Sequence, residues 1–294
     1  MMKPRILLTF TASAALAAAL AVSASLAFAG GPVDDALAAF KAGEYEKAVT
    51  LASKVPADDP ARTKALYLVG EAELARERWD EAKSAFESVL AAKKDSVPAM
   101  TGLGRAHAGK GDREAAEAML KKAVETDAKD PAAHRALGEI LLAAEKTDEA
   151  RKELEAAYKL DPKDPLNARS LVEGHLRANA PDAAQKVADA FSKTAPDSAT
   201  THFLKGLVLD RRGKAGDAIE HYEKAVKADE KYLDAHRNLA VVYTTSNANY
   251  ASPDKIEKAC AHAQAYIDLG GKDQQLKELL DQIKGFMDQY KKGK

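Results

Sequence analysis

The chain is organised around a period of 34 residues, in which small side chains return at two fixed places. The first place holds Gly70, Gly104, Gly138 and Gly206, and the second, twelve residues later, holds Ala82, Ala116, Ala150, Ala184 and Ala218. A fixed period of this length is typical of solenoids, in which each unit is a small motif that buries its apolar face against the next unit. The period therefore restricts the fold to a linear stack of similar units.

The unit at residues 131–164 shows what the repeat contains. Its apolar residues recur at three- and four-residue spacing in two blocks, which is the period of an amphipathic helix. The polar residues 145–148 between the blocks leave room only for a short turn, so the unit should be a hairpin of two antiparallel helices. Asp130 before Pro131 predicts an N-cap followed by a first-turn proline, and Asp164 repeats this signal before Pro165.

The small residues have a packing reason. Two helices approach closely only where one side chain is tiny, so we expect Gly138 on the first helix to face Ala150 on the second. Leu137 and Leu154 should fill the space beside this contact. A larger residue at Ala150 would overpack the site, at a cost of about 1–3 kcal/mol.

The pattern resembles the tetratricopeptide repeat family. The matching residues of one unit are His134, Leu137, Gly138, Leu141, Ala150, Leu154, Ala157 and Pro162. Further units begin near Thr63, Val97, Pro165, Ala199 and Leu233. The resemblance implies an all-α fold, a right-handed α-solenoid of about seven helix hairpins that ends in a C-terminal capping helix.

These signals divide the chain after residue 29 into three segments. We expect a degenerate first repeat at residues 30–62, the solenoid at 63–272 with an insertion at about 246–253, and the capping helix and tail at 273–294. Ser252 and Pro253 should restart the helix after the insertion. Val172 stands in the glycine place of the fifth unit, so we expect a slightly splayed helix pair there.

Residues 1–29 have the features of a secretory signal peptide. Lys3 and Arg5 precede a run rich in Ala and Leu, which ends in the small-residue site before Gly30. The sequence thus predicts a periplasmic or secreted protein, cleaved near Ala29. The alternative is an uncleaved segment that anchors the chain in the inner membrane, because the run approaches the length of a span.

Charge and apolar content exclude two kinds of partner. The formal net charge is -1, and it becomes -3 once the basic leader is removed, so the clustered basic excess of a general nucleic-acid binder is missing. The sequence after residue 29 has no second long apolar stretch, and we therefore expect no membrane insertion of the mature chain.

Candidate chemistry is weak. Residues 104–111 nearly match a phosphate-binding loop, but they lack the Ser or Thr after Lys110 and the preceding strand. His134, His202 and His236 share one repeat position, and His107 and His262 have no partner at the short spacing that zinc sites use. Packed histidines are the better interpretation. We expect no catalytic residues, no metal and no cofactor, and Cys260 should be a packed thiol without an internal disulfide.

The resemblance implies a concave surface lined by the first helix of each repeat. Carried over, its partner-binding positions hold Tyr67, Glu71, Arg105, Arg135, Glu139, Arg169, Glu173, Arg177, Phe203, Arg211 and Arg237. Arginines suit this role because one guanidinium binds a carboxylate through two parallel hydrogen bonds. The alternative is that Arg135–Glu139 and Arg169–Glu173 are pairs along one helix face, worth a few tenths of a kcal/mol.

The sequence therefore predicts a non-enzymatic scaffold of the bacterial envelope that binds a peptide or protein segment in this groove. The resemblance suggests roles in envelope assembly, secretion or pilus biogenesis. Two alternatives stay open. One is a structural scaffold that self-associates as a homo-oligomer, because solenoids stack end to end. The other is a ligand-binding protein or enzyme that uses the insertion as a lid, since a long loop is often functional.

Overall fold

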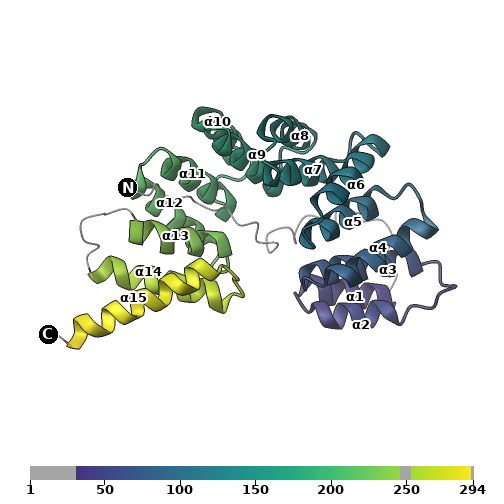
Figure 1. Cartoon of the computed structure of the whole chain (residues 1–294), viewed down its shortest axis with the longest axis horizontal. Coiled ribbons are helices and arrows are strands. Elements are labelled where there is room, and N and C mark those ends of the chain that lie inside the picture. Colours follow the sequence, from purple (N-terminus) through teal and green to yellow (C-terminus); the bar gives the residue numbers. More distant parts are fainter. Residues whose placement is uncertain (1–30, 246–252, 293–294) are drawn as a thin grey trace. The chain divides into compact units, whose positions relative to one another are not determined.

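The computed structural model of the chain describes residues 31–245 and 253–292, and side chains over 31–245 and 254–285. These residues form helices and no strand (Figure 1). In chain order the helices are α1 (Pro32–Lys41), α2 (Tyr45–Ser53), α3 (Arg62–Ala75), α4 (Trp79–Ala92), α5 (Val97–Gly109), α6 (Arg113–Thr126), α7 (Pro131–Ala143), α8 (Thr147–Leu160), α9 (Pro165–Arg177), α10 (Pro181–Ser192), α11 (Ala199–Arg211), α12 (Ala215–Ala228), α13 (Leu233–Thr245), α14 (Pro253–Asp268) and α15 (Gln274–Lys292). The prediction of an all-α solenoid of helix hairpins is confirmed.

The described residues divide into two compact units. The N-terminal unit comprises α1–α9 up to Ala178, and the C-terminal unit comprises α10–α15 from Asn179. The division falls in the fifth repeat, which carries Val172, and the expected looser pairing there stays a prediction. In the N-terminal unit the first helices α1, α3, α5, α7 and α9 pack side by side, and α2, α4, α6 and α8 pack as their hairpin partners. In the C-terminal unit α11–α12 and α13–α14 are hairpins, and α15 packs on α13 and α14.

Each glycine in the first place of the repeat lies under a large side chain of the second helix. A Cβ atom at Gly138 would lie 2.6 Å from Leu154 Cγ and 3.1 Å from the carbonyl oxygen of Ala150. Ala150 is fully buried, as predicted. Gly70 lies in the same way under Phe86, Gly104 under Leu120 and Gly206 under Tyr222. The glycines are thus required by packing, and Gly104 belongs to a helical interior instead of a phosphate-binding loop.

A left-handed residue ends the first helix of the six hairpins from α1–α2 to α11–α12. Glu145 has φ +61°, and the next amide, that of Lys146, donates to the carbonyl of Leu141 at 2.9 Å. This arrangement satisfies carbonyls that the helix end leaves unpaired. Positive φ recurs every 34 residues, at Gly43, Glu77, Gly111, Glu145, Asn179 and Gly213. The turn is therefore conserved in shape along the repeats although its residue type changes.

The predicted helix starts are confirmed. Asp130 accepts a hydrogen bond from the amide of Ala133 at 2.8 Å, and Asp164 accepts one from Leu166 at 2.8 Å. Helix α14 begins at Pro253, where we expected the chain to resume after the insertion. Residues 1–30 and most of the insertion lie outside the described residues, so the signal peptide and the lid stay expectations.

The last helix covers the end of the C-terminal unit. Leu276, Leu280 and Ile283 of α15 are buried, which agrees with the expected amphipathic cap. Just before α15, Asp273 accepts a hydrogen bond at 2.7 Å from Arg237 Nε on α13. The described part of the chain contains no helix that is both long and apolar enough to cross a membrane.

Candidate interaction face of the N-terminal unit

Polar side chains from the first helices of the N-terminal unit form a connected row, which we call the charged ladder. Because these helices pack side by side, residues 34 positions apart in the sequence lie next to each other on one face. The ladder consists of Tyr67 and Glu71 on α3, Arg105 on α5, Arg135 and Glu139 on α7, and Asn167, Arg169, Ser170 and Glu173 on α9, with Asp164 at the start of α9. Seven of these ten residues were predicted from the sequence.

The first part of the ladder joins α3 to α5. Arg105 Nη1 lies 3.2 Å from Glu71 Oε2, and the Glu71 side chain is 5% exposed. Burial alone would lower the pKa of Arg105, but the carboxylates of Glu71 and Glu139 outweigh burial and raise it. Burial, followed by the charge of Glu71, also raises the pKa of Tyr67 far above its ordinary value. Arg105 is therefore a fixed positive charge between two carboxylates, and Tyr67 stays a neutral phenol.

The second part joins α7 to α9. Arg135 Nη1 donates to Asp164 Oδ2 at 2.9 Å and to Asn167 Oδ1 at 3.0 Å. Ser170 Oγ donates to Glu139 Oε1 at 2.7 Å. Arg135 and Glu139 on α7 thus both bond to the next repeat, and these contacts stabilise the stacking of the repeats.

The structure also contains the ion pairs along one helix face that the sequence offered as an alternative role for these residues. Arg169 Nε donates to Glu173 Oε1 at 2.8 Å, and Arg135 Nε lies 3.9 Å from Glu139 Oε1. Arg177 Nη1 donates to the carbonyl of Leu142 at 3.2 Å. The predicted arginines of the N-terminal unit therefore all have partners within the protein. Part of these side chains stays accessible: Arg105 is 26% exposed, and Glu139 beside Arg135 is 33% exposed.

The other predicted site residues lie in the C-terminal unit, apart from this ladder. Phe203 is 2% exposed, and its ring centroid lies 5.8 Å from that of Tyr222 and 5.2 Å from that of Tyr232. The expectation that Phe203 lines a surface is corrected, because Phe203 is a core residue. Arg237 forms an ion pair with Asp273, which lies directly before the capping helix α15. Arg211 is exposed at the end of α11.

Three members of the ladder were missed by sequence reasoning. Asp164 was identified as an N-cap, but its second carboxylate oxygen also binds Arg135. Asn167 is fully buried and donates to the carbonyl of Asp161 at 3.1 Å while it accepts from Arg135. The signal available for Asn167 and Ser170 was their polarity at helix positions that are apolar or small in most other repeats.

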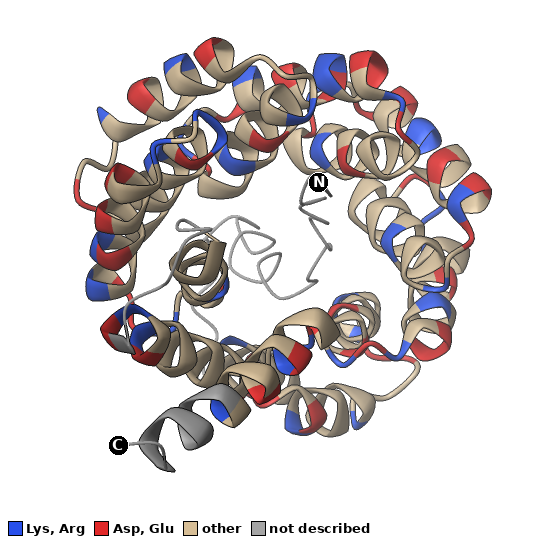
Figure 2. Cartoon of the chain, turned by 60° about the vertical axis from the view of Figure 1, so that its left-hand side comes forward, with Lys and Arg blue, Asp and Glu red and all other residues tan. Residues whose placement is uncertain are grey.

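The surface carries both signs of charge throughout. Lys and Arg are interspersed with Asp and Glu along the helices in Figure 2. This mixture agrees with the exclusion of a general nucleic-acid binder, which needs a clustered basic surface.

The histidines form no metal cluster in the described residues, where no group of three or more His, Cys, Asp or Glu side chains could hold an ion. One expectation is corrected, however. His262 does have a partner, because its Nδ1 lies 3.0 Å from Nδ1 of His236. Sequence spacing hid this contact, since the insertion before α14 lengthens the separation of the two residues. Cys260 is a free, half-buried thiol whose pKa is raised by burial.

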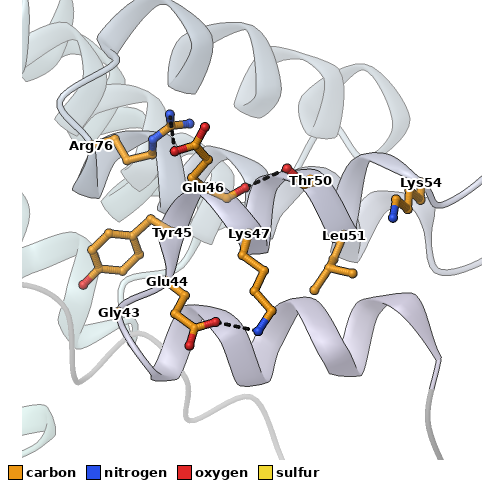
Figure 3. A pocket seen from close by; sticks show the side chains of 9 residues that line it. All are labelled: Gly43, Glu44, Tyr45, Glu46, Lys47, Thr50, Leu51, Lys54 and Arg76. Atoms are coloured by element: carbon orange, nitrogen blue, oxygen red, sulfur yellow. Dashed lines mark hydrogen bonds and ion pairs between the residues drawn. The ribbon is translucent and has the colours of Figure 1, made fainter.

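A shallow depression of about 750 Å³ lies over α2 and the end of α3 (Figure 3). Four of its charged groups already pair with one another. Lys47 Nζ donates to Glu44 Oε2 at 2.7 Å, and Arg76 Nη2 lies 3.9 Å from Glu46 Oε2. No convergent set of unpaired groups points to a ligand there, so the charged ladder is the better candidate surface.

Sequence profiles of one family match most of the chain. Three profiles, each described as tetratricopeptide repeat, together extend from residue 33 to residue 249. They match residues 73–140 for the first, 33–97, 170–232 and 203–249 for the second, and 131–173 for the third. A search of curated protein sequences gives no significant match.

Solved structures share the fold. Yeast Tom70 superposes with a TM-score of 0.71 at 16% identity over 90% of this chain and 60% of that chain. A tetratricopeptide repeat protein from Parabacteroides merdae gives 0.65 at 13% identity, over 86% of this chain and 97% of the other. A chain of the Cut9–Hcn1 hetero-tetramer gives 0.62 at 16% identity, and this protein spans 48% of its length. The profile matches and the shared fold show that the chain belongs to the tetratricopeptide repeat family, whose members are scaffolds for protein–protein interaction.

Proposed function

We propose that this protein is a non-enzymatic scaffold of the bacterial cell envelope that binds a peptide or protein segment along the charged ladder. The observation that carries the proposal is the row of partly accessible Arg, Glu and Tyr side chains on four successive first helices. A scaffold role in general follows from the family. The envelope location rests on the basic and apolar character of residues 1–29.

The chemistry of the ladder restricts the partner. Its charges are already paired, so a bound segment has to replace or extend these hydrogen bonds with its own donors and acceptors. An extended peptide offers both along its backbone. Acidic side chains of the segment would share Arg105 or Arg169, and its amides would donate to Glu139 or Glu173. Rim-exposed pairs of this kind add specificity more than affinity.

A charge-exchange variant tests the proposal. In Arg169→Glu with Glu173→Arg the pair along α9 is kept, but the charges that a partner meets are reversed. The matched control is Lys83→Glu with Glu87→Lys on α4, a second helix, where the same i,i+4 pair lies at 3.7 Å. The readout is photo-crosslinking in the native host from probes at Arg105 and Glu139, followed by mass spectrometry.

We expect one dominant envelope protein to be captured by both probes, and its capture to be lost in the α9 exchange and kept in the α4 exchange. Equal capture in both variants would place the interface elsewhere. Crosslinks only between copies of the chain would favour the self-associating scaffold. The N-terminal residue of the scaffold itself, purified from the host, tests export separately, because cleavage after Ala29 leaves Gly30 first.

A further inference from the structure

Two histidine pairs occupy the same place in successive hairpins of the C-terminal unit. Nδ1 of His202 on α11 lies 3.4 Å from Nδ1 of His221 on α12. Nδ1 of His236 on α13 lies 3.0 Å from Nδ1 of His262 on α14. In both cases the contact joins the first helix of a hairpin to the second, so it lies across the interface that keeps the hairpin closed.

The N-terminal unit has a different pair in the same place. His134 on α7 has its Nδ1 2.7 Å from Glu153 Oε2 on α8, and its Nε2 3.1 Å from the carbonyl oxygen of Ala128. Both ring nitrogens face acceptors, so a protonated imidazole donates to both and is attracted by the carboxylate. An added ring proton is therefore accommodated by an acceptor here, with no like charge opposite it.

The same proton has the opposite effect on a pair of histidines. Nε2 of His236 lies 3.0 Å from the carbonyl oxygen of Glu230 and donates to it. In the neutral ring Nδ1 then carries a lone pair, which accepts a hydrogen bond from Nδ1 of His262. If both rings are protonated, two N–H groups face each other across 3.0 Å and two positive charges are in contact. The closed α13–α14 hairpin is therefore compatible with at most one protonated ring.

The surroundings of His262 keep it neutral. Burial, and then the charge of His236, lowers the pKa of His262 to about 4. Glu223 on α12 acts in the other direction, and Lys258 on α14 adds to the lowering. From α13, the ring of Tyr243 stacks on that of His262 with centroids 6.1 Å apart.

The second pair lies among lysines. Burial lowers the pKa of both His202 and His221, and Lys224 on α12 and Lys205 on α11 lower both further. The opposing carboxylates are Asp197, which precedes α11, and Glu220 on α12. The lysines also disfavour a bound metal cation at this pair.

We propose that the two histidine pairs make the C-terminal unit acid-sensitive, so that mild acidification loosens the α11–α12 and α13–α14 hairpins while the α7–α8 hairpin stays closed. The sign follows from proton linkage. Since the pKa values of His202, His221 and His262 are lower in the closed hairpins than in the open ones, the open state binds more protons in acid. The stability that depends on a neutral His262 is complete above the ordinary histidine value of about 6.5 and is lost as the pH falls toward about 4. For His202 and His221 stability is lost in the same direction.

Hydrogen exchange of the full chain tests the proposal. After correction for the intrinsic exchange rate, we expect the opening equilibrium of amides in α11–α14 to rise roughly tenfold from pH 7.5 to pH 5.0. Amides in α7–α8 should change by much less. The double variant His221→Glu with His262→Glu gives both hairpins the pairing of His134 and Glu153, and should abolish the rise.

A second double variant guards against loss of folding. His221→Gln with His262→Gln removes one histidine of each pair without adding charge, so two protonated rings no longer face each other. Its opening equilibrium should rise with acid much less than that of the wild type, while its circular dichroism at pH 7.5 stays that of the wild type. If α11–α14 of the wild type opens no more than α7–α8, or if acid opens the glutamine variant as it opens the wild type, the proposal is wrong.

Discussion

Gly206 offers a direct test of why the repeats keep a glycine. A Cβ atom at Gly206 would lie 2.5 Å from Cε1 and 2.6 Å from Cδ1 of Tyr222, distances that van der Waals contact does not allow. Tyr222 is fully buried, and Phe203 from α11 packs against its ring. Phe203 packs in turn against Tyr232, so a shift of the Tyr222 ring toward Phe203 would disturb a second aromatic contact.

Two opposing effects set the expected size of Gly206→Ala. Alanine favours a helix interior over glycine by about 0.8–1 kcal/mol. Overpacking a buried site costs about 1–3 kcal/mol, so the net result is a loss of up to about 2 kcal/mol. The control is Gly216→Ala on α12 of the same hairpin, where an added Cβ meets nothing within 4 Å. That variant should gain up to about 1 kcal/mol, which leaves the two variants about 1–3 kcal/mol apart.

The assay is urea unfolding followed by circular dichroism, together with hydrogen exchange of α11 and α12 to assign the loss to this hairpin. We expect the midpoint of Gly206→Ala to fall below that of Gly216→Ala, with faster exchange in both helices. If the two variants are equally stable, the close approach of Tyr222 does not explain Gly206. The packing argument for all glycines in the first place of the repeat is then refuted.

Three further predictions concern the N-terminal unit. Gly111→Ala should cost about 1–2 kcal/mol in thermal unfolding, because φ is +84° there, whereas Glu145→Gly at φ +61° should not destabilise. Glu71→Ala should cost about 1–3 kcal/mol because it leaves Arg105 half-buried without its nearest carboxylate, and a double-mutant cycle with Arg105→Ala should recover part of that loss. Gly109→Ala should push aside the ring of Trp79, whose Cδ2 would lie 2.5 Å from the new Cβ, and shift tryptophan fluorescence to the red without a large change in helix content.

The repeat register made most of the fold predictable. Helices begin at Val97, Pro131 and Leu233 as the 34-residue period required, since small residues at a helix crossing determine which faces can approach. The close approach of Gly138 to Ala150 was also predictable, because both residues belong to one hairpin and the connecting turn is short, although the side chain nearest to a Cβ atom at Gly138 is that of Leu154. Constraints of this kind act within one hairpin, so the sequence of a single repeat is enough to predict them.

The backbone conformation of the turns is less predictable from the local sequence. Glycine in the turn predicts a left-handed residue, as at Gly43, Gly111 and Gly213. Glu77 and Glu145 adopt a similar positive φ although their residue type does not predict it. They do so because the two helices that flank them are already held by the core of the hairpin. Tertiary packing there overrides the preference of a single residue, at a cost of about 1–2 kcal/mol.

The charged ladder could be located from the sequence, but its role could not. In a stack of equal repeats, the spacing that lines up residues for a partner also brings them within hydrogen-bond distance of each other, as Arg105 and Glu71 show across 34 residues. An arginine at such a position therefore serves the fold whether or not it also serves a partner. For this reason an alanine variant is ambiguous, since it removes both roles together. Exchange of Arg169 and Glu173 keeps an ion pair along α9 and reverses the charges that a partner meets, so it separates the two roles better than removal of either side chain does.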